Sequence, residues 1–185
     1  NLIRSLVSVD GDEHKALRGV GFPAFVPKKV GALEADIRII AREFVDRMLA
    51  MGPACDFAKD VAFLYPLRVI MSVLGVPQED EPYLLKLTQE LFGASDPERN
   101  ANGDFGLATA MEFFGYLAGV VAQRRADPKD DLMSVVATAT IHDEPLSDME
   151  TLSYGMLLAA AGHDTTSSSV GVGMMQLARN PGEFA

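Results

Sequence analysis

The hydrophobic positions of this chain recur every three or four residues, the spacing that places side chains on one face of an α-helix. Residues 30–51 show this spacing most clearly, with charged residues between the apolar ones: Leu33, Ile37, Ile40, Phe44, Met48 and Met51. No stretch alternates apolar and polar residues with the period of two that a half-buried strand requires. We therefore expect a mainly α-helical protein.

Proline and glycine residues divide the helical pattern into about seven expected helices. Gly75, with Pro77 just beyond it, closes the third helix, and residues 93–103 have the composition of a loop. The expected helices cover residues 12–20, 30–51, 58–74, 82–92, 105–125, 131–140 and 148–179. The expected architecture is a set of helices packed around the last and longest one.

The longest expected helix contains a polar break near its middle. Ser147 and Glu150 have the spacing of a capping box at its start, and Asn180, followed by proline, ends it. The roughly 32 residues between these ends would span about 48 Å at about 1.5 Å per residue. The flanks are apolar on nearly every face, so we expect the helix to be buried all round. Its centre nevertheless reads AGHDTTSSS over residues 161–169, so the helix is either bent there or presents polar groups to a ligand.

Two kinds of chemistry are possible at this polar break. Ala161 and Gly162 have little or no side-chain bulk, so a flat ligand could lie against the helix backbone. Asp164 and Thr165 place a carboxylate beside a hydroxyl, which is a suitable pair for relaying protons. The alternative is a kink whose hydroxyls bond within the helix, with Asp164 in solvent. The residues by themselves leave both interpretations open.

Composition and charge narrow the function classes. The 185 residues carry a formal net charge of −10, with a sequence pI near 4.7, which argues against a nucleic-acid partner. Cys55 is the one cysteine, so no intrachain disulfide can form, and we expect it to be buried as a small apolar residue. His163 and Asp164 would be costly in lipid, which argues against the long helix as a membrane span. We expect a cytoplasmic protein with no membrane partner.

A second candidate site lies near the start of the chain. His14 and Arg18 are four residues apart, so they lie one turn from each other on the same face of the expected helix 12–20. Two such donors can bind a pair of carboxylates, although an ordinary solvent-exposed helix face is the alternative. Residues 1–30 also carry more basic than acidic side chains, in contrast to the rest of the chain.

Residues 161–166, AGHDTT, match the A/G-G-x-D/E-T-T oxygen-activation motif of the cytochrome P-450 haem-thiolate monooxygenases, which lies in that family's long central I helix. Residues 12–18 resemble the family's C helix, residues 66–77 resemble its E helix, and Asn180 with Pro181 resembles the start of its J helix. The resemblance is collinear over essentially all 185 residues. Within the family, the sequence looks most similar to soluble bacterial members that oxidise terpineol.

This resemblance implies a cytochrome P-450 fold and haem b (iron protoporphyrin IX) as the cofactor. By the same resemblance, His14 and Arg18 would bind the haem propionates, and Ala161 and Gly162 would line the groove where dioxygen binds. Ferredoxin and its reductase would be the electron donors, with an acidic ferredoxin docking on the basic region.

The resemblance also implies roles in the reaction. Asp164 would supply protons and Thr165 would stabilise the bound oxygen species, while Leu157 and Ala160 would touch the substrate. The full-length protein would insert one oxygen atom of O2 into a small hydrophobic substrate such as a terpenoid.

One departure from the family pattern limits this expectation. The sequence contains neither the family's Glu-x-x-Arg helix nor the loop that carries the thiolate ligand, and Cys55 stands in a different context. Residues 1–185 therefore look like a single partial domain, from the C helix to the start of the J helix. Because haem activation needs the axial thiolate, we expect this segment alone neither to bind haem tightly nor to turn over.

Two other function classes remain open at this point. His142-Asp143, His163-Asp164 and His14 could belong to a His-Asp metal-dependent phosphohydrolase, because such side chains hold divalent metals. The chain could also be a non-catalytic, truncated helical protein that acts only by binding.

Overall fold

The computed structural model describes residues 6–93 and 105–184, and these residues form a mainly helical fold. The α-helices of the described residues are α1 (Gly11–Gly21), α2 (Pro27–Ala32), α3 (Glu34–Ala50), α4 (Leu64–Leu74), α5 (Glu81–Gly93), α6 (Phe105–Ala126), α7 (Leu132–Ala137) and α8 (Asp148–Arg179). Short 3-10 turns cover Phe22–Ala24, Gln78–Asp80 and Pro181–Phe184, and a π-helical turn, η2, covers Ala58–Ala62. The expected all-α class is confirmed. The helix expected over residues 58–74 is divided into η2 and α4, and further differences are described below.

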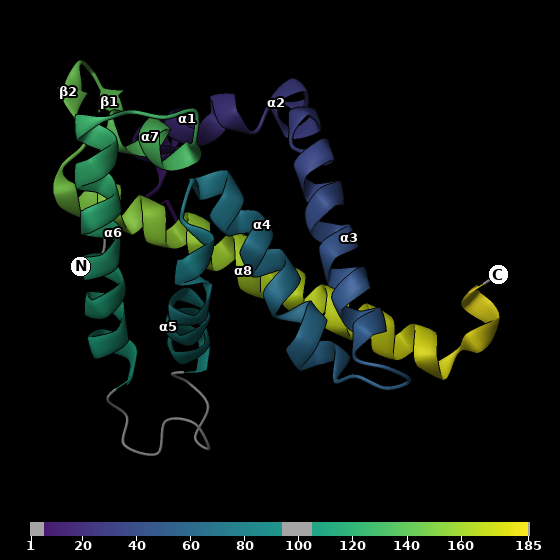
Figure 1. Ribbon diagram of the computed structural model, residues 1–185. Coiled ribbons are helices and arrows are strands. Elements are labelled where there is room, and N and C mark those ends of the chain that lie inside the picture. Colours follow the sequence, from purple (N-terminus) through teal and green to yellow (C-terminus); the bar gives the residue numbers. More distant parts are fainter. Residues whose placement is uncertain (1–5, 94–104, 185) are drawn as a thin grey trace.

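Helix α8 is the axis of the molecule, and Figure 1 shows it crossing the whole width of the fold. Helix α6 packs on it along one part of its length, and α4 makes its largest helix–helix contact. Apolar residues of α4 recur one turn apart and are almost fully buried: Leu67, Met71 and Leu74. They join buried residues of α5, α6, α7 and α8 in one hydrophobic core that includes Leu87, Phe113, Met133 and Ala159. Burial of this core is the main force that holds α4 against α8.

The two ends of α8 lie where the sequence places them. The side-chain oxygen of Ser147 accepts from the backbone N–H of Glu150 at 3.3 Å, and the Glu150 carboxylate accepts from the backbone N–H of Ser147 at 3.1 Å. Asn180 is the residue that caps the other end, directly before Pro181. The expected capping box, stop signal and length are therefore confirmed.

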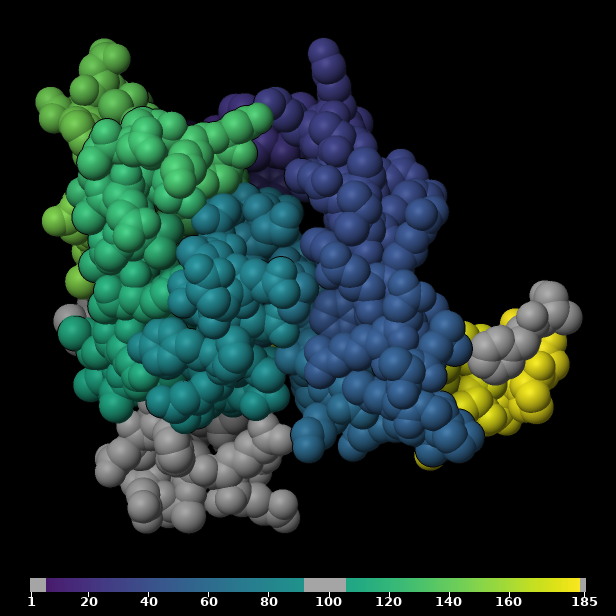
Figure 2. All heavy atoms as spheres, in the orientation of Figure 1, coloured from purple at the N-terminus to yellow at the C-terminus, as the bar shows by residue number. Residues whose placement is uncertain are grey.

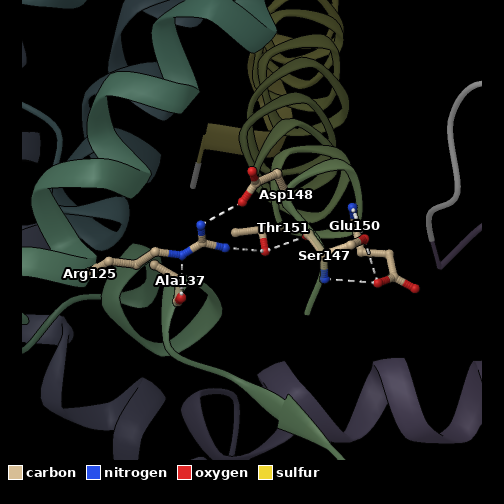
Figure 3. A network of polar contacts seen from close by, with 6 residues as sticks. All are labelled: Arg125, Ala137, Ser147, Asp148, Glu150 and Thr151. Atoms are coloured by element: carbon tan, nitrogen blue, oxygen red, sulfur yellow. Dashed lines mark hydrogen bonds and ion pairs between the residues drawn. The ribbon is translucent and has the colours of Figure 1, made fainter. Parts of the chain in front are cut away.

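Arg125, near the end of α6, ties the start of α8 to two other helices (Figure 3). Its Nε donates to the carbonyl of Ala137, the last residue of α7, at 3.1 Å. Its Nη1 lies 2.5 Å from a carboxylate oxygen of Asp148, and its Nη2 lies 3.4 Å from the hydroxyl of Thr151. One guanidinium thus joins the ends of α6 and α7 to the first turn of α8, which fixes where the long helix starts.

The prediction that α8 is buried all round is wrong for its second half. Residues Thr151 to Ala160 include most of its buried positions, but from residue 161 onward the buried side chains are His163 and Ser167. Val172 is 54% exposed and Met175 is 40% exposed. Figure 2 shows the end of α8, in yellow, standing out from one edge of the molecule. One long face of this part of α8 carries no cover from the described residues.

Several smaller expectations differ from the structure. The helix expected over residues 30–51 is divided, because α2 starts at Pro27 and α3 starts only at Glu34. A two-residue hairpin, β1 (Thr140–Ile141) with β2 (Glu144–Pro145), stands where helix 131–140 was expected to end. Its turn residues, His142 and Asp143, have φ of 53° and 66°, and strands this short give no period-two pattern.

Cys55 and the segment around residues 93–103 complete the comparison. Cys55 is exposed in the link between α3 and η2, so the prediction that it is buried is wrong. The expected loop lies almost entirely outside the described residues, and its first residue, Gly93, ends α5. Among the described residues, no helix combines the length and the apolar character that crossing a lipid bilayer requires.

Candidate functional site

The polar segment of α8 has one exposed face and one buried face. Ala161 and Thr165 are exposed and lie one helical turn apart, with half-buried Leu157 one turn before them. His163 and Ser167 are each 2% exposed and lie on the opposite side of the helix. Since successive residues are about 100° apart around a helix, Thr165 and His163 point about 160° apart. Two of the candidate oxygen-activation residues, Ala161 and Thr165, therefore share the face that the described residues leave open.

The hydroxyl groups on this face bond within the helix. Thr165 Oγ1 donates to the carbonyl of Ala161 at 2.9 Å, and Ser169 Oγ donates to the carbonyl of Thr165 at 2.8 Å. The helix itself is unbroken over Asp148–Arg179. In this conformation the hydroxyls bond within the helix, as the alternative interpretation expects, but the helix continues without interruption. The Thr165 oxygen keeps lone pairs that can accept from a ligand or water, and it can donate outward if its bond to Ala161 is exchanged.

Asp164 stands between the two faces. Its side chain is half-buried, and its negative charge acts on the neighbouring His163 ring. Asp164 lies about 60° around the helix from Ala161, at the edge of the exposed face. That position is compatible with the proton exchange expected of Asp164, which stays a prediction.

Gly162 lies on a packed flank of α8, where it faces α4. A Cβ at Gly162 would lie 2.6 Å from Cδ1 and 2.8 Å from Cγ1 of Ile70, which is too close for any real contact. In this structure Ile70 fills the space left by the missing side chain, and the expectation that Gly162 also borders a ligand groove stays a prediction. Glycine at this position lets α4 approach α8, while Ala161 is the small residue on the open face.

His163 anchors the buried face of α8 to the start of α4. Its Nε2 lies 2.9 Å from the carbonyl of Phe63, so this nitrogen carries the hydrogen and donates. Burial lowers the pKa of His163 below its ordinary value, although the bond to Phe63 and the charge of Asp164 oppose that shift. The ring is therefore neutral at pH 7. Among the described residues, its Nδ1 and the Oγ of Ser167 are buried without hydrogen-bond partners.

His14 and Arg18 lie on α1, where Asp10 caps the start of the helix through the N–H of Gly11. His14 is half-buried and Arg18 is exposed. Within residues 6–93 and 105–184, neither side chain has a hydrogen bond or an ion pair. The structure thus places both on one helix with their donors free for a carboxylate-bearing ligand.

Tyr154 joins α1 to α8 from the buried side. Its hydroxyl oxygen accepts from the backbone N–H of Gly21 at 3.1 Å, and the Tyr154 side chain is 3% exposed. Burial raises the pKa of Tyr154, and the hydrogen bond from Gly21 together with the nearby charge of Arg18 partly offsets this shift. A Cβ on Gly21 would lie 2.6 Å from the hydroxyl oxygen, so the contact requires glycine. The α1 site is thereby held in a fixed relation to the first half of α8.

The remaining candidate residues fall in different surroundings. Leu157 shares the open face with Ala161, whereas Ala160 is 8% exposed and lies about 100° around the helix from Ala161. Among the described residues, no hydrogen bond or ion pair joins His14 or Arg18 directly to Ala161, Asp164 or Thr165. The structure therefore brings together only part of the proposed site.

The His-Asp metal site finds no support. Among the described residues, no three His, Cys, Asp or Glu side chains are grouped so that they could hold a metal ion. His163 already donates to Phe63 inside the core, while His142 occupies the hairpin turn.

Sequence reasoning missed four residues that shape the site: Phe63, Ile70, Tyr154 and Gly21. Each acts through a contact more than 50 residues away along the chain. Tyr154 offered a weak signal, since a tyrosine within an apolar helix usually needs a partner for its hydroxyl.

Comparison with known proteins identifies relatives over the whole chain. No protein-family model matches the sequence. The chain is 40% identical over 195 residues to cytochrome P450-terp from Pseudomonas sp, covering 100% of this chain and 46% of that protein. It is 32% identical over 179 residues to steroid C26-monooxygenase from Mycolicibacterium smegmatis, covering 97% of this chain and 41% of the relative.

Solved structures give the same result. CYP108D1 from Novosphingobium aromaticivorans superimposes with a TM-score of 0.86 at 43% identity, over 100% of this chain and 43% of that one. Cytochrome P450 CYP268A2 from Mycobacterium marinum, solved in complex with pseudoionone, gives a TM-score of 0.91 at 28% identity, over 98% of this chain and 44% of its own. The chain spans somewhat less than half the length of these relatives.

Proposed function

Because the chain belongs to the cytochrome P450 family, we propose that the protein is a haem-dependent monooxygenase. It would insert one oxygen atom of O2 into a small hydrophobic substrate. The observation that carries the proposal is the open face of α8, where Ala161 and Thr165 of the AGHDTT motif lie exposed with Asp164 at its edge.

The free donors on α1 fit a haem cofactor. A haem carries two propionate carboxylates, and His14 and Arg18 offer an imidazole and a guanidinium one turn apart. The open face of α8 near Ala161 is lined by small side chains, which suits a flat ligand. Haem b, when bound, supplies the iron chemistry that activates dioxygen. We propose that His14 and Arg18 hold its propionates and that Ala161, together with the backbone at Gly162, borders its oxygen-binding side.

The side chains of α8 then have distinct tasks. Thr165 would orient an oxygen atom on the open face through its hydroxyl, by exchanging its present bond to the carbonyl of Ala161. Asp164 would carry protons between this face and solvent. Leu157 and Ala160 would contribute to an apolar wall for the substrate, and we propose a terpenoid as the substrate class.

The electron donor would be an acidic ferredoxin with its reductase. Lys28 and Lys29 are exposed on α2, which follows α1 in the chain. Such basic side chains steer the approach of an acidic partner, an effect that salt weakens.

The test is to express the full-length gene product and record its spectrum and its products. We expect a Soret band that shifts on reduction and binding of carbon monoxide as a thiolate haem does, and one labelled oxygen atom in the product under isotopically labelled O2. A purified full-length protein without haem, or a product whose inserted oxygen atom comes from water, would overturn the proposal. As a comparison, residues 1–185 alone are expected to give no such Soret shift.

The α1 site has its own test within the same protein. His14→Ala with Arg18→Ala should lower haem retention during gel filtration, whereas Lys15→Ala on the same helix should leave it unchanged. Lys15 is a matched control because its partner among the described residues is exposed Asp12, at 2.9 Å. Equal retention of haem in the wild type, the double variant and Lys15→Ala would exclude His14 and Arg18 as propionate ligands.

A further inference from the structure

His163 is a buried polar residue for which the proposed oxygen chemistry has no direct use. It points into the fold, away from the open face of α8, and its Nε2 donates to the carbonyl of Phe63. We propose that His163 is a positioning residue, which holds the polar turn of α8 against the Phe63 carbonyl and thereby fixes the side of the helix that presents Ala161 and Thr165. The catalytic consequence rests on the proposed monooxygenase function, but the anchoring itself does not.

The position of the bond along α8 supports this role. His163 is two residues from Ala161 and two from Thr165, and it lies on the opposite side of the helix from both. A rotation of α8 that turned Thr165 away from the open face would have to carry His163 away from Phe63. A hydrogen bond on the same turn as Ala161 and Thr165 therefore restrains the rotation of α8 about its axis more directly than apolar contacts in the first half of the helix.

Phe63 is a well-fixed anchor for such a bond. It lies between the π-helical turn η2 and α4, and its own N–H donates to the carbonyl of Ala58 at 3.0 Å. The anchor is thus set by backbone hydrogen bonding. Both η2 and α4 also contact α8 directly, so the anchor and the helix belong to one packed unit.

Gly162, the residue before His163, provides a second restraint on the same turn of α8. Gly162 is packed against Ile70 of α4, on a flank of the helix adjacent to His163. A steric contact on one flank and a directional hydrogen bond on the next restrain α8 about its axis. Since a hydrogen bond depends on direction as well as distance, the histidine adds what apolar packing alone does not provide.

The test uses the full-length protein with two replacements at position 163. His163→Gln keeps an N–H donor at a similar distance from the backbone, while His163→Phe keeps a ring and removes the donor. Ser167→Ala is the matched control, because it alters the same buried face one turn along without breaking a hydrogen bond. Hydrogen exchange of backbone amides is followed in peptides that cover residues 158–170.

We expect His163→Phe to speed exchange of these amides about tenfold, since it leaves the buried Phe63 carbonyl without this donor. His163→Gln should stay within about threefold of the wild type, and Ser167→Ala should not accelerate exchange. Wild-type exchange in His163→Phe, or equal acceleration in the Gln and Phe variants, would overturn the anchoring role.

Nitrogen NMR of the wild-type protein provides a test that requires no variant to fold. We expect His163 to be neutral at pH 7, with Nε2 protonated and Nδ1 not protonated. A protonated Nδ1, or a ring that exchanges between tautomers, would contradict the bond to Phe63.

The catalytic consequence is measured separately. In His163→Phe, the fraction of electrons that reach product should fall while the substrate dissociation constant changes less than about threefold, and His163→Gln should restore most of the coupling. Unchanged coupling in a His163→Phe protein with faster exchange would restrict the residue to a structural role and overturn its catalytic consequence. If the protein proves not to be a monooxygenase, the exchange and NMR measurements still decide whether His163 anchors the turn.

Discussion

The side chain of Ile70 occupies the space that a side chain at Gly162 would require. A Cβ on Gly162 would lie 2.6 Å from Cδ1 of Ile70, and real Cβ atoms essentially never approach a neighbour so closely. The glycine of the AGHDTT segment therefore serves the packing of α4 against α8. Small size alone does not show which side of a helix needs the space.

Gly162→Ala should consequently destabilise the fold by about 1–3 kcal/mol, the usual cost of overpacking. Gly173→Ala is the matched control on the same helix, because a Cβ there meets nothing within 4 Å. That change should be neutral or stabilise the fold by up to about 1 kcal/mol, through helix propensity. Denaturant unfolding measures both, and Gly162→Ala combined with Ile70→Ala should cost less than the sum of the single changes. Additive costs would show that the two residues do not share this space.

The bond between Tyr154 and Gly21 predicts a second pair of variants. Tyr154→Phe should cost about 1 kcal/mol, because the Gly21 N–H loses a buried acceptor. Gly21→Ala should cost more, since its Cβ would lie 2.6 Å from the Tyr154 hydroxyl oxygen. Removing that oxygen relieves the clash, so Gly21→Ala should be milder in the Tyr154→Phe background. An equally large cost in both backgrounds, measured by thermal unfolding, would place the clash elsewhere.

The buried His163 predicts a pH dependence of stability. Its pKa is lowered in the folded state from the ordinary value of 6.5, chiefly by burial, so the unfolded chain binds a proton more readily. The contribution of neutral His163 is therefore complete above about pH 6.5 and is lost as the pH falls toward the folded-state pKa. One histidine changes the slope of the unfolding free energy against pH by at most about 1.4 kcal/mol per pH unit. His163→Gln should flatten the unfolding free energy between pH 6.5 and 5 relative to the wild type, and an unchanged slope would contradict a buried neutral histidine.

The role of Thr165 can be tested in the full-length protein by measuring whether the electrons from the reductant end in product or in hydrogen peroxide. Thr165→Ala removes the hydroxyl from the open face, so substrate affinity should persist while reducing equivalents are diverted to hydrogen peroxide. Thr165→Ser keeps a hydroxyl and should retain coupling, and Ser168→Ala removes an exposed hydroxyl one turn along as a control. Peroxide and product are measured per reduced nicotinamide consumed. Unchanged coupling in Thr165→Ala would exclude the hydroxyl as the proton-relay group.

The sequence predicts features that depend on neighbours along the chain. The capping box of Ser147 and Glu150 and the stop at Asn180 form bonds between residues three or four apart, so α8 could be located before its surroundings were known. Gly75 has φ of 72°, the left-handed conformation expected of a glycine that ends a helix. The AGHDTT segment and the pair His14 and Arg18 are likewise local motifs, and they carried the resemblance to the family and the candidate site that this resemblance implies.

Only the tertiary structure decided which side of each helix is covered. Gly162 and Ala161 are equally small in the sequence, yet one packs on Ile70 and the other is exposed. His163 looked like part of a polar break, but Phe63, 100 residues earlier, makes it a buried donor. Hydrophobic periodicity gives the angle between residues of one helix and not the identity of the helices around it. The rotation of α8, and with it the role of each residue in its polar segment, is therefore set by packing between distant parts of the chain.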